Sequence, residues 1–140
     1  MKPAAIVIHH SLTKDSKSVS WSAIRRYHKQ TCGWREIGYH YGIEMVGTEP
    51  EIFVGRMMNE YGAHCKDSGM NRISLGICLV GNFDEEAPPT ILWERGLVLV
   101  RSLLDLLDIS PSDVYGHRDF SDKSCPGDMF DMDQFRKDLI

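Results

Sequence analysis

The sequence predicts an α/β fold in a single domain spanning residues 1–140. Patterns of buried strands and of helices alternate along the chain, which is typical of helices packed around a central sheet. The length suits one hydrophobic core that needs no disulfide bonds, and the chain contains no repeat, linker or low-complexity segment. We therefore expect one layered domain with one functional site.

The first predicted element is a buried strand over residues 4–10. This run is apolar and β-branched, and it ends in the two polar residues His9 and His10. Side chains that follow the carboxyl end of a strand are often functional in α/β proteins. The strand therefore delivers two histidines to one edge of the predicted sheet.

A helix is predicted over residues 21–31, with Ser18 or Ser20 as its cap. Its apolar positions recur at helical spacing and include Tyr27, whereas His28 lies on the charged side of the same projection. We expect Tyr27 to face the sheet and His28 to face solvent.

The middle of the chain predicts three strands. Residues 39–46 alternate apolar and polar side chains, residues 47–50 carry turn residues, and residues 51–55 complete a hairpin. The run 73–80 is almost continuously apolar, as in a central strand that is covered on both faces.

The C-terminal third predicts a long helix, a short strand and a closing helix. The long helix follows two prolines and covers residues 90–107, with apolar positions broad enough to need burial along most of its length. The strand at 113–116 places His117 at its end, and residues 131–139 form the last helix.

Composition narrows the class of protein. The formal net charge of −4 and the pI near 5.8 argue against nucleic acid as a partner. The longest apolar stretch, 91–107, is interrupted by charges and falls short of the roughly 20 residues of a membrane helix. The start of the chain lacks the apolar core of a signal peptide, so we expect a protein made in the cytoplasm, without membrane insertion. Its four cysteines are then expected to be free thiols.

Three side chains that are distant in sequence form a candidate metal site: His9, His117 and Cys125. Two imidazoles and a thiolate suit Zn²⁺, and three protein ligands leave a fourth position for a water molecule, as in catalytic zinc sites. Each segment alone is weak evidence, because paired histidines are often only surface groups. Only the fold can bring the three together.

Several short segments occur together in a characteristic order. They are Val7-Ile-His9, Gly38-Tyr39-His40-Tyr41, Gly62-Ala-His64-Cys65-Lys66, Ile73-Ser-Leu-Gly76-Ile-Cys-Leu-Val-Gly81, Gly116-His117 and Lys123-Ser-Cys125-Pro126. In this order the chain resembles the type 2 N-acetylmuramoyl-L-alanine amidases, which include T7-type endolysins and peptidoglycan recognition proteins. The resemblance runs from about Ala5 to the last helix and is strongest to the T7-type branch.

The resemblance implies a central mixed β-sheet flanked by helices, with a metal in a surface groove. It implies a zinc hydrolase that cleaves the amide between N-acetylmuramic acid and L-alanine in bacterial peptidoglycan. One Zn²⁺ ion would be held by His9, His117 and Cys125. Tyr39 and Lys123 match the catalytic positions of the T7-type enzymes and would stabilise charge that develops on the substrate. From the residues alone, these two would be a packed aromatic and a solvated charge.

Two further histidines match positions near the groove. His64 is expected to contact substrate or to transfer a proton. His40 is expected either to line the groove or to orient a neighbouring site residue. The pair His64-Cys65 also suggests a nucleophilic dyad, but adjacent residues of a strand point to opposite faces, which disfavours that interpretation.

The sequence therefore favours a phage or prophage endolysin that acts as a monomer and reaches the cell wall through a holin-type pore or after lysis. Two alternatives remain: a peptidoglycan-binding or partner-regulating module without hydrolysis, and a cytoplasmic amidase that recycles muropeptides. Recognition-only relatives commonly carry serine at the position of Cys125, and recycling relatives typically carry Asp there and Glu in place of Tyr39. The residues of this chain follow the lytic pattern at both positions.

Overall fold

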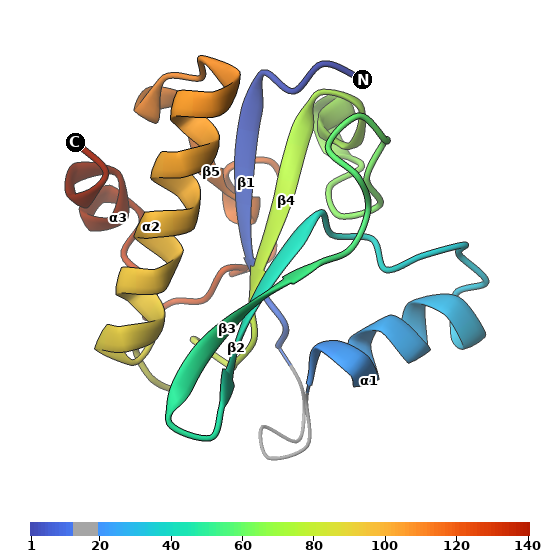
Figure 1. Ribbon diagram of the computed structural model, residues 1–140, viewed down its shortest axis with the longest axis horizontal. Helices are drawn as coiled ribbons and strands as arrows, with labels where there is room; N and C mark the ends of the chain where they lie inside the picture. The colour runs from blue at the N-terminus through green and yellow to red at the C-terminus, as the bar shows by residue number, and fades with distance from the viewer. Residues whose placement is uncertain (13–19) are drawn as a thin grey trace.

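The computed structural model describes residues 1–12 and 20–140, which build a five-stranded mixed sheet with α2 and α3 on one face and α1 on the other (Figure 1). The strands are β1 (Ala5–His10), β2 (Tyr41–Val46), β3 (Glu49–Val54), β4 (Ser74–Leu79) and β5 (Val114–Gly116). The α-helices are α1 (Trp21–Arg26), α2 (Thr90–Leu107) and α3 (Met132–Asp138), and the shorter turns are the π-helical η1 (Tyr27–Thr31) and the 3-10 turns η2 (Asp67–Arg72), η3 (Pro111–Asp113) and η4 (His117–Asp119). The predicted α/β class and the mixed sheet are confirmed.

The order of the strands in the sheet is β3-β2-β4-β1-β5. β1 runs parallel to both of its neighbours, β4 and β5, and β2 runs parallel to β4, whereas β2 and β3 form an antiparallel hairpin. Ile8 of β1 pairs with Gly116 of β5, so His9 of β1 and His117, which directly follows β5, emerge at the same edge of the sheet. Strand register therefore brings together two histidines that are far apart in sequence.

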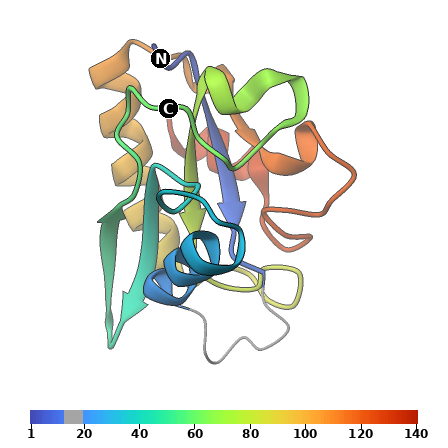
Figure 2. The same cartoon turned by 90° about the vertical axis from the view of Figure 1, so that its right-hand side faces the viewer.

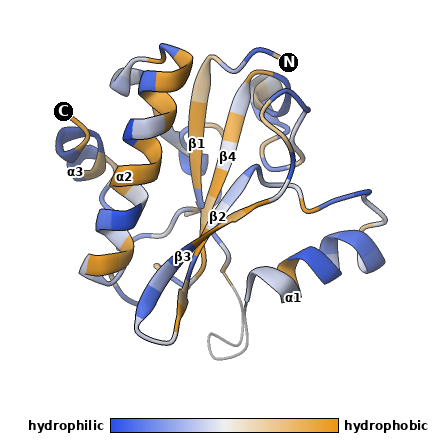
Figure 3. Ribbon diagram, in the orientation of Figure 1, coloured by the Kyte–Doolittle hydropathy of each residue, from blue (hydrophilic) through white to orange (hydrophobic). Residues whose placement is uncertain are grey.

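The face toward α2 holds the main apolar core. On β4, Leu75, Ile77 and Leu79 point to this side, and on β1, Ile6 and Ile8 do the same. These side chains pack with fully or almost fully buried residues of α2 and α3. Figure 3 shows the hydrophobic colours of β1 and β4 in the centre of the molecule and the hydrophilic colours of the far end of the α1–η1 helix. Burial of these apolar side chains away from water makes the largest favourable contribution to the stability of the fold.

The opposite face of the same strands has a different composition. It presents Val7 and His9 on β1, and Ser74, Gly76 and Cys78 on β4. Figure 2 views the molecule from this side, with α1 in front and the orange segment that follows β5 beside β1. Alternation along each strand thus directs the large apolar side chains into the main core and places His9 and Ser74, with smaller side chains, on the opposite face.

The predicted helix over 21–31 is present, but its second half is π-helical. Ser20 caps it, with its hydroxyl accepting a hydrogen bond from the backbone N–H of Ala23 (3.1 Å); the alternative cap, Ser18, lies outside the described residues. A π-turn adds residues to each turn, which rotates the following side chains relative to an α-helical projection. The predicted faces of Tyr27 and His28 are therefore wrong: Tyr27 is 57% exposed, whereas His28 is partly buried.

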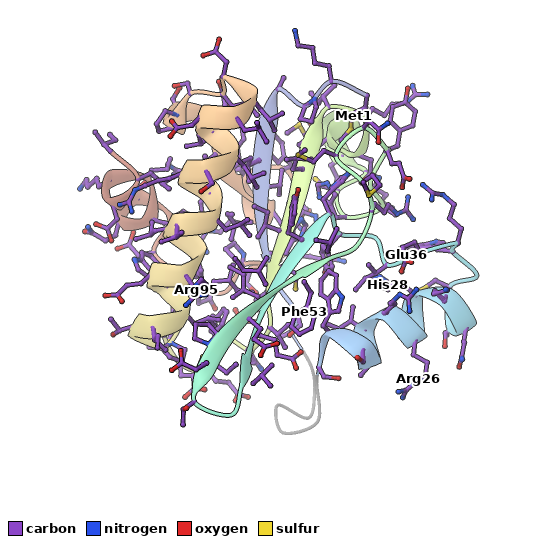
Figure 4. The ribbon with its side chains drawn as sticks, viewed as in Figure 1. Met1, Arg26, His28, Glu36, Phe53 and Arg95 are labelled. Carbon is purple, nitrogen blue, oxygen red and sulfur yellow. The ribbon has the colours of Figure 1, made fainter. Side chains whose placement is uncertain are left out.

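Figure 4 shows the position of His28, which lies on the side of the helix that faces the rest of the molecule, with Arg26 on the opposite side. Two strands also begin two residues away from their predicted starts. Tyr39 and His40 precede β2, which begins at Tyr41, and β3 begins at Glu49 because the hairpin turn is shorter than expected. Among the helices of the described residues, none combines the length and the apolarity that would let it span a membrane.

Candidate metal centre and groove

The three predicted metal ligands meet at the carboxyl end of β1. The ligand atoms of His9, His117 and Cys125 lie within 4.8 Å of one another. The rings of His9 and His117 are 4.7 Å apart, and the Cys125 Sγ lies 3.6 Å from the Nδ1 of His9. His9 and Cys125 are buried, while His117 is partly open to the groove. The fold therefore assembles the group that the sequence predicted.

The donor set fits a zinc ion. Bond lengths of about 2.0–2.1 Å to nitrogen and about 2.3 Å to sulfur, at a tetrahedral angle, separate the two donors by about 3.5–3.6 Å. That is the distance found between the Nδ1 of His9 and the Sγ of Cys125 (3.6 Å). Burial raises the pKa of the Cys125 thiol to about 12, so a thiolate at this position needs a cation beside it.

The loop that carries Cys125 is held by residues that the sequence did not single out. Asp84 accepts hydrogen bonds from the Ser124 hydroxyl (3.0 Å) and from the backbone N–H of Asp128 (2.9 Å), so it bridges both sides of Cys125. The backbone N–H of Arg118 donates to the Cys125 carbonyl (2.7 Å), and its guanidinium donates to the Gly127 carbonyl (2.7 Å). These contacts join segments far apart in sequence, and no local pattern identifies them.

Tyr39 and Lys123 lie beside the three ligands. The ring of Tyr39 is 5.2 Å from that of His9, and burial raises the pKa of its hydroxyl well above the ordinary value. Tyr39 is therefore a protonated hydrogen-bond donor at neutral pH. Lys123 is exposed at the rim, and after the larger effect of burial its positive charge further lowers the pKa of His117. Both predicted catalytic side chains thus have access to the same space.

His64 is buried against the metal group and reaches the groove only with a small part of its surface. Its Nδ1 lies 2.9 Å from the Nε2 of His9, and its own Nε2 lies 3.3 Å from the Ser74 carbonyl oxygen. Burial lowers the pKa of His64 to about 3, so the side chain is neutral at physiological pH. The neighbouring Cys65 thiol lies in a loop and contacts the Asp67 carbonyl (3.8 Å), not the His64 ring, which gives no support to a nucleophilic dyad.

His40 does not line the groove, contrary to the first of its two expected roles. It is completely buried, its Nδ1 accepts a hydrogen bond from the Gly76 N–H (3.0 Å), and its Nε2 lies 2.9 Å from the Glu60 carbonyl oxygen. Both ring nitrogens are hydrogen-bonded to main-chain groups, so His40 connects β4, through Gly76, with the loop that contains Glu60. His10 points to the apolar face instead, where its Nδ1 accepts from the Phe83 N–H (3.1 Å).

A second group of potential ligands, Cys65, Asp67 and His117, also has its ligand atoms within 4.8 Å of one another. It shares His117 with the first group. Its cysteine packs with Ala5, Val7 and Met70, and burial raises the pKa of the Cys65 thiol. The first group combines two imidazoles with a thiol, donors that zinc favours, and lies in the same cavity as Tyr39, so it is the better metal site.

The metal group opens into a groove made of two adjoining cavities, of about 580 and 520 Å³. The larger contains the three ligands and Tyr39 and extends past Leu12 and His28; the smaller extends past Lys66, Asp67, Asn71 and Asp122. The two share Trp34, Ala63, His64, His117 and Lys123. Trp34 and His28, whose rings are 4.7 Å apart, were not predicted as groove residues, and the π-turn explains why His28 was missed.

Comparisons with known proteins agree with this geometry. Residues 1–128 match the family model described as N-acetylmuramoyl-L-alanine amidase. The endolysin of Enterobacteria phage T3 is 36% identical over 125 residues, which cover 87% of this chain and 79% of that protein, and the endolysin of Escherichia phage T7 is 34% identical with the same coverage. The solved structure of the N-acetylmuramoyl-L-alanine amidase LysC from Clostridium intestinale is 33% identical, with a TM-score of 0.83 over 99% of this chain and 85% of that one. The chain belongs to the N-acetylmuramoyl-L-alanine amidase family and is an amidase of the phage endolysin type.

Proposed function

We propose that His9, His117 and Cys125 hold one zinc ion and that the protein uses it to hydrolyse the muramoyl-L-alanine amide of bacterial peptidoglycan. The observation that carries the proposal is the convergence of the three side chains, with a sulfur-to-nitrogen distance of 3.6 Å that suits zinc. When bound, the ion supplies a Lewis acid for the amide carbonyl and lowers the pKa of a water molecule.

Tyr39 and Lys123 supply hydrogen-bond donors and charge to the reacting amide. The raised pKa of Tyr39 keeps its hydroxyl protonated, so it donates to the oxygen on which negative charge develops. Lys123 is on the loop two residues before Cys125 and lines both cavities, so its ammonium group reaches the same oxygen from the solvent side. Both donors act more strongly on the transition state than on the uncharged substrate.

The groove suits an extended, polar substrate. It is open to solvent and continues on both sides of the metal group, so a long polymer can lie across it without having to enter a closed pocket. Trp34 offers an aromatic surface where the two cavities meet, and Lys66, Asp67 and Asp122 offer both signs of charge in the smaller one. Muramoyl peptides combine apolar sugar faces with charged peptide groups, which matches this lining.

We further propose that the protein acts as a monomer and reaches the wall as endolysins do, through a pore or after lysis. The similarity to phage endolysins supports this route. A size-exclusion measurement tests the monomer, and addition of the protein to permeabilised and to intact cells tests the need for a pore.

The decisive test of the function is mass spectrometry of the products released from purified peptidoglycan. The wild type is expected to release stem peptides that begin with L-alanine, and Cys125→Ala is expected to release none, because the variant lacks one of the three ligands. Cys32→Ala is the matched control, since Cys32 is exposed and lines neither cavity of the groove. Binding to peptidoglycan without release of any product by the wild type would replace the hydrolase with a recognition module.

A further inference from the structure

We propose that His64 is a positioning residue that fixes the tautomer of His9 and so selects the Nδ1 atom of His9 as the metal ligand. The inference rests on the proposed zinc site and assigns His64 a role other than contact with substrate. Its basis is a chain of two contacts that runs from the Ser74 carbonyl through His64 to His9.

The direction of the hydrogen bonds follows from the chemistry of the atoms at the end of the chain. The Ser74 carbonyl oxygen can only accept, so the His64 Nε2, which lies 3.3 Å away, carries the proton. In a neutral imidazole the other nitrogen is then an acceptor. The His64 Nδ1 must therefore accept the hydrogen bond that joins it to the His9 Nε2 at 2.9 Å.

The same logic determines the state of His9. Because its Nε2 donates to His64, its Nδ1 carries no proton and offers a lone pair. That atom is the one that lies 3.6 Å from the Cys125 Sγ, on the side of the metal group. The opposite tautomer of His64 would place two lone pairs against each other at Ser74, so the neutral pair has only one favourable arrangement.

The surroundings of His64 keep its ring in this position. A Cβ atom at Gly76 would lie 2.4 Å from the His64 Cγ, and one at Gly62 would lie 2.5 Å from its Cδ2, so two glycines leave a slot that the ring fills. The backbone N–H groups of His64 and Cys65 both donate to the Asn71 side-chain oxygen, at 2.8 and 2.7 Å. A ring held this firmly suits the orientation of a neighbour better than the capture of a mobile substrate.

Metal-ligating histidines commonly donate their second nitrogen to a carboxylate or a carbonyl group. Here the acceptor for His9 is the neutral imidazole of His64. Its Nε2–H in turn donates to the Ser74 carbonyl oxygen of β4, the strand that pairs with β1. His64 therefore orients His9 without adding negative charge to the metal site.

The first test is a two-bond ¹H–¹⁵N spectrum of the histidine rings in the zinc-loaded wild type. We expect His9 to be protonated at Nε2 with zinc on Nδ1, and His64 to be protonated at Nε2 with a free Nδ1. A zinc-loaded protein in which His9 binds through Nε2, or in which His64 is protonated at Nδ1, overturns the inference while leaving the zinc site intact. Failure of the wild type to bind zinc would instead overturn the proposed function.

The second test is zinc affinity measured by competition with a chelator. His64→Phe keeps a planar ring but removes the acceptor, and it is expected to weaken zinc binding about 10- to 100-fold, the usual effect of losing such a partner. His64→Asn restores an acceptor close to the Nδ1 position and is expected to recover most of that loss. Tyr27→Phe, which changes an exposed side chain that lines neither cavity, is the control and should bind zinc as the wild type does. Wild-type affinity in His64→Phe, or an equal loss in both His64 variants, would contradict the positioning role.

Discussion

The two faces of the sheet use the same strands for different purposes. Toward α2 and α3, β1 and β4 present apolar side chains that belong to one buried cluster, followed by His10 at the end of β1. Toward α1 they present His9 together with Ser74 and Gly76, and the apolar contacts there are divided into two smaller clusters. Alternation with a period of two lets one strand serve both faces, because neighbouring residues point in opposite directions.

The difference teaches how the fold separates stability from chemistry. The apolar face buries mostly hydrocarbon and, at the end of β1, His10, whereas the groove face buries three histidines, His9, His40 and His64, whose ring nitrogens must find partners. We therefore expect changes on the first face to lower the free energy of unfolding and changes on the second to affect metal binding or rate. Four experiments, from the largest expected effect to the smallest, test this division.

Removal of the metal should distinguish the roles of the two faces most clearly. Exhaustive chelation is expected to abolish amidase activity and zinc to restore it, while the far-UV circular dichroism of the metal-free protein stays close to that of the loaded form. The apolar core on the α2 face contains none of the three ligands, which is the reason for the second expectation. Full activity of a metal-free sample would exclude the zinc mechanism, and global unfolding on chelation would show that the two faces are not independent.

A cavity in the apolar core should have the opposite effect. Leu103→Ala on α2 removes a side chain that is 4% exposed and is expected to lower the free energy of unfolding by about 2–5 kcal/mol. Leu106→Ala on the same helix is the control, because Leu106 is 68% exposed. Chemical denaturation measures both, and zinc affinity under native conditions should not change. A weakened zinc site in Leu103→Ala would break the proposed separation.

Lys123→Ala should affect rate without affecting metal or fold. The ammonium group lies at the rim of the groove and is not a potential ligand, so zinc content is expected to equal that of the wild type. Loss of a donor to the developing charge is expected to lower kcat about 10²- to 10³-fold. Steady-state kinetics together with metal analysis measures both quantities. A variant that loses its zinc would assign Lys123 to the integrity of the site instead.

The smallest effect is expected at the edge of the groove face, where Arg25 of α1 forms a bidentate ion pair with Glu36 (2.6 and 2.9 Å). The hydrogen bond from Arg25 lowers the pKa of Glu36 to about 2. A carboxylate with a depressed pKa stabilises the folded state above its unfolded pKa of about 4.3 and loses that contribution as the pH falls toward 2. Glu36→Gln should therefore lower Tm slightly at pH 7, and the difference from the wild type should shrink below pH 4. A difference that stays constant with pH would rule out the ion pair as its cause.

The sequence predicts the elements that have a strong local period. The runs at β1 and β4 and the broad apolar stripe of α2 are confirmed because burial on both faces, or along most of a helix, leaves a clear pattern. The convergence of His9, His117 and Cys125 was expected from the family resemblance and is explained by the parallel pairing of β1 with β5.

What the sequence misses depends on geometry that has no local pattern. The π-helical turn reverses Tyr27 and His28 and brings the His28 ring to 4.7 Å from that of Trp34, and an α-helical projection cannot reveal it. The contact between His9 and His64 joins residues 55 positions apart, and the hydrogen bond between Asp84 and Ser124 of the Cys125 loop joins residues 40 positions apart. Residue types alone do not specify such distances.

The separation of the ligands along the chain has a consequence for folding kinetics. His9 and Cys125 are 116 residues apart, so the complete donor set exists only after β1 and the C-terminal loop have come together. Loop closure over such a length is entropically costly, which makes this contact a demanding one to form. Refolding in the presence of a spectroscopically active ion such as Co²⁺ would therefore measure this step. The rate at which the cobalt–thiolate absorption appears would give the rate at which His9 and Cys125 come together.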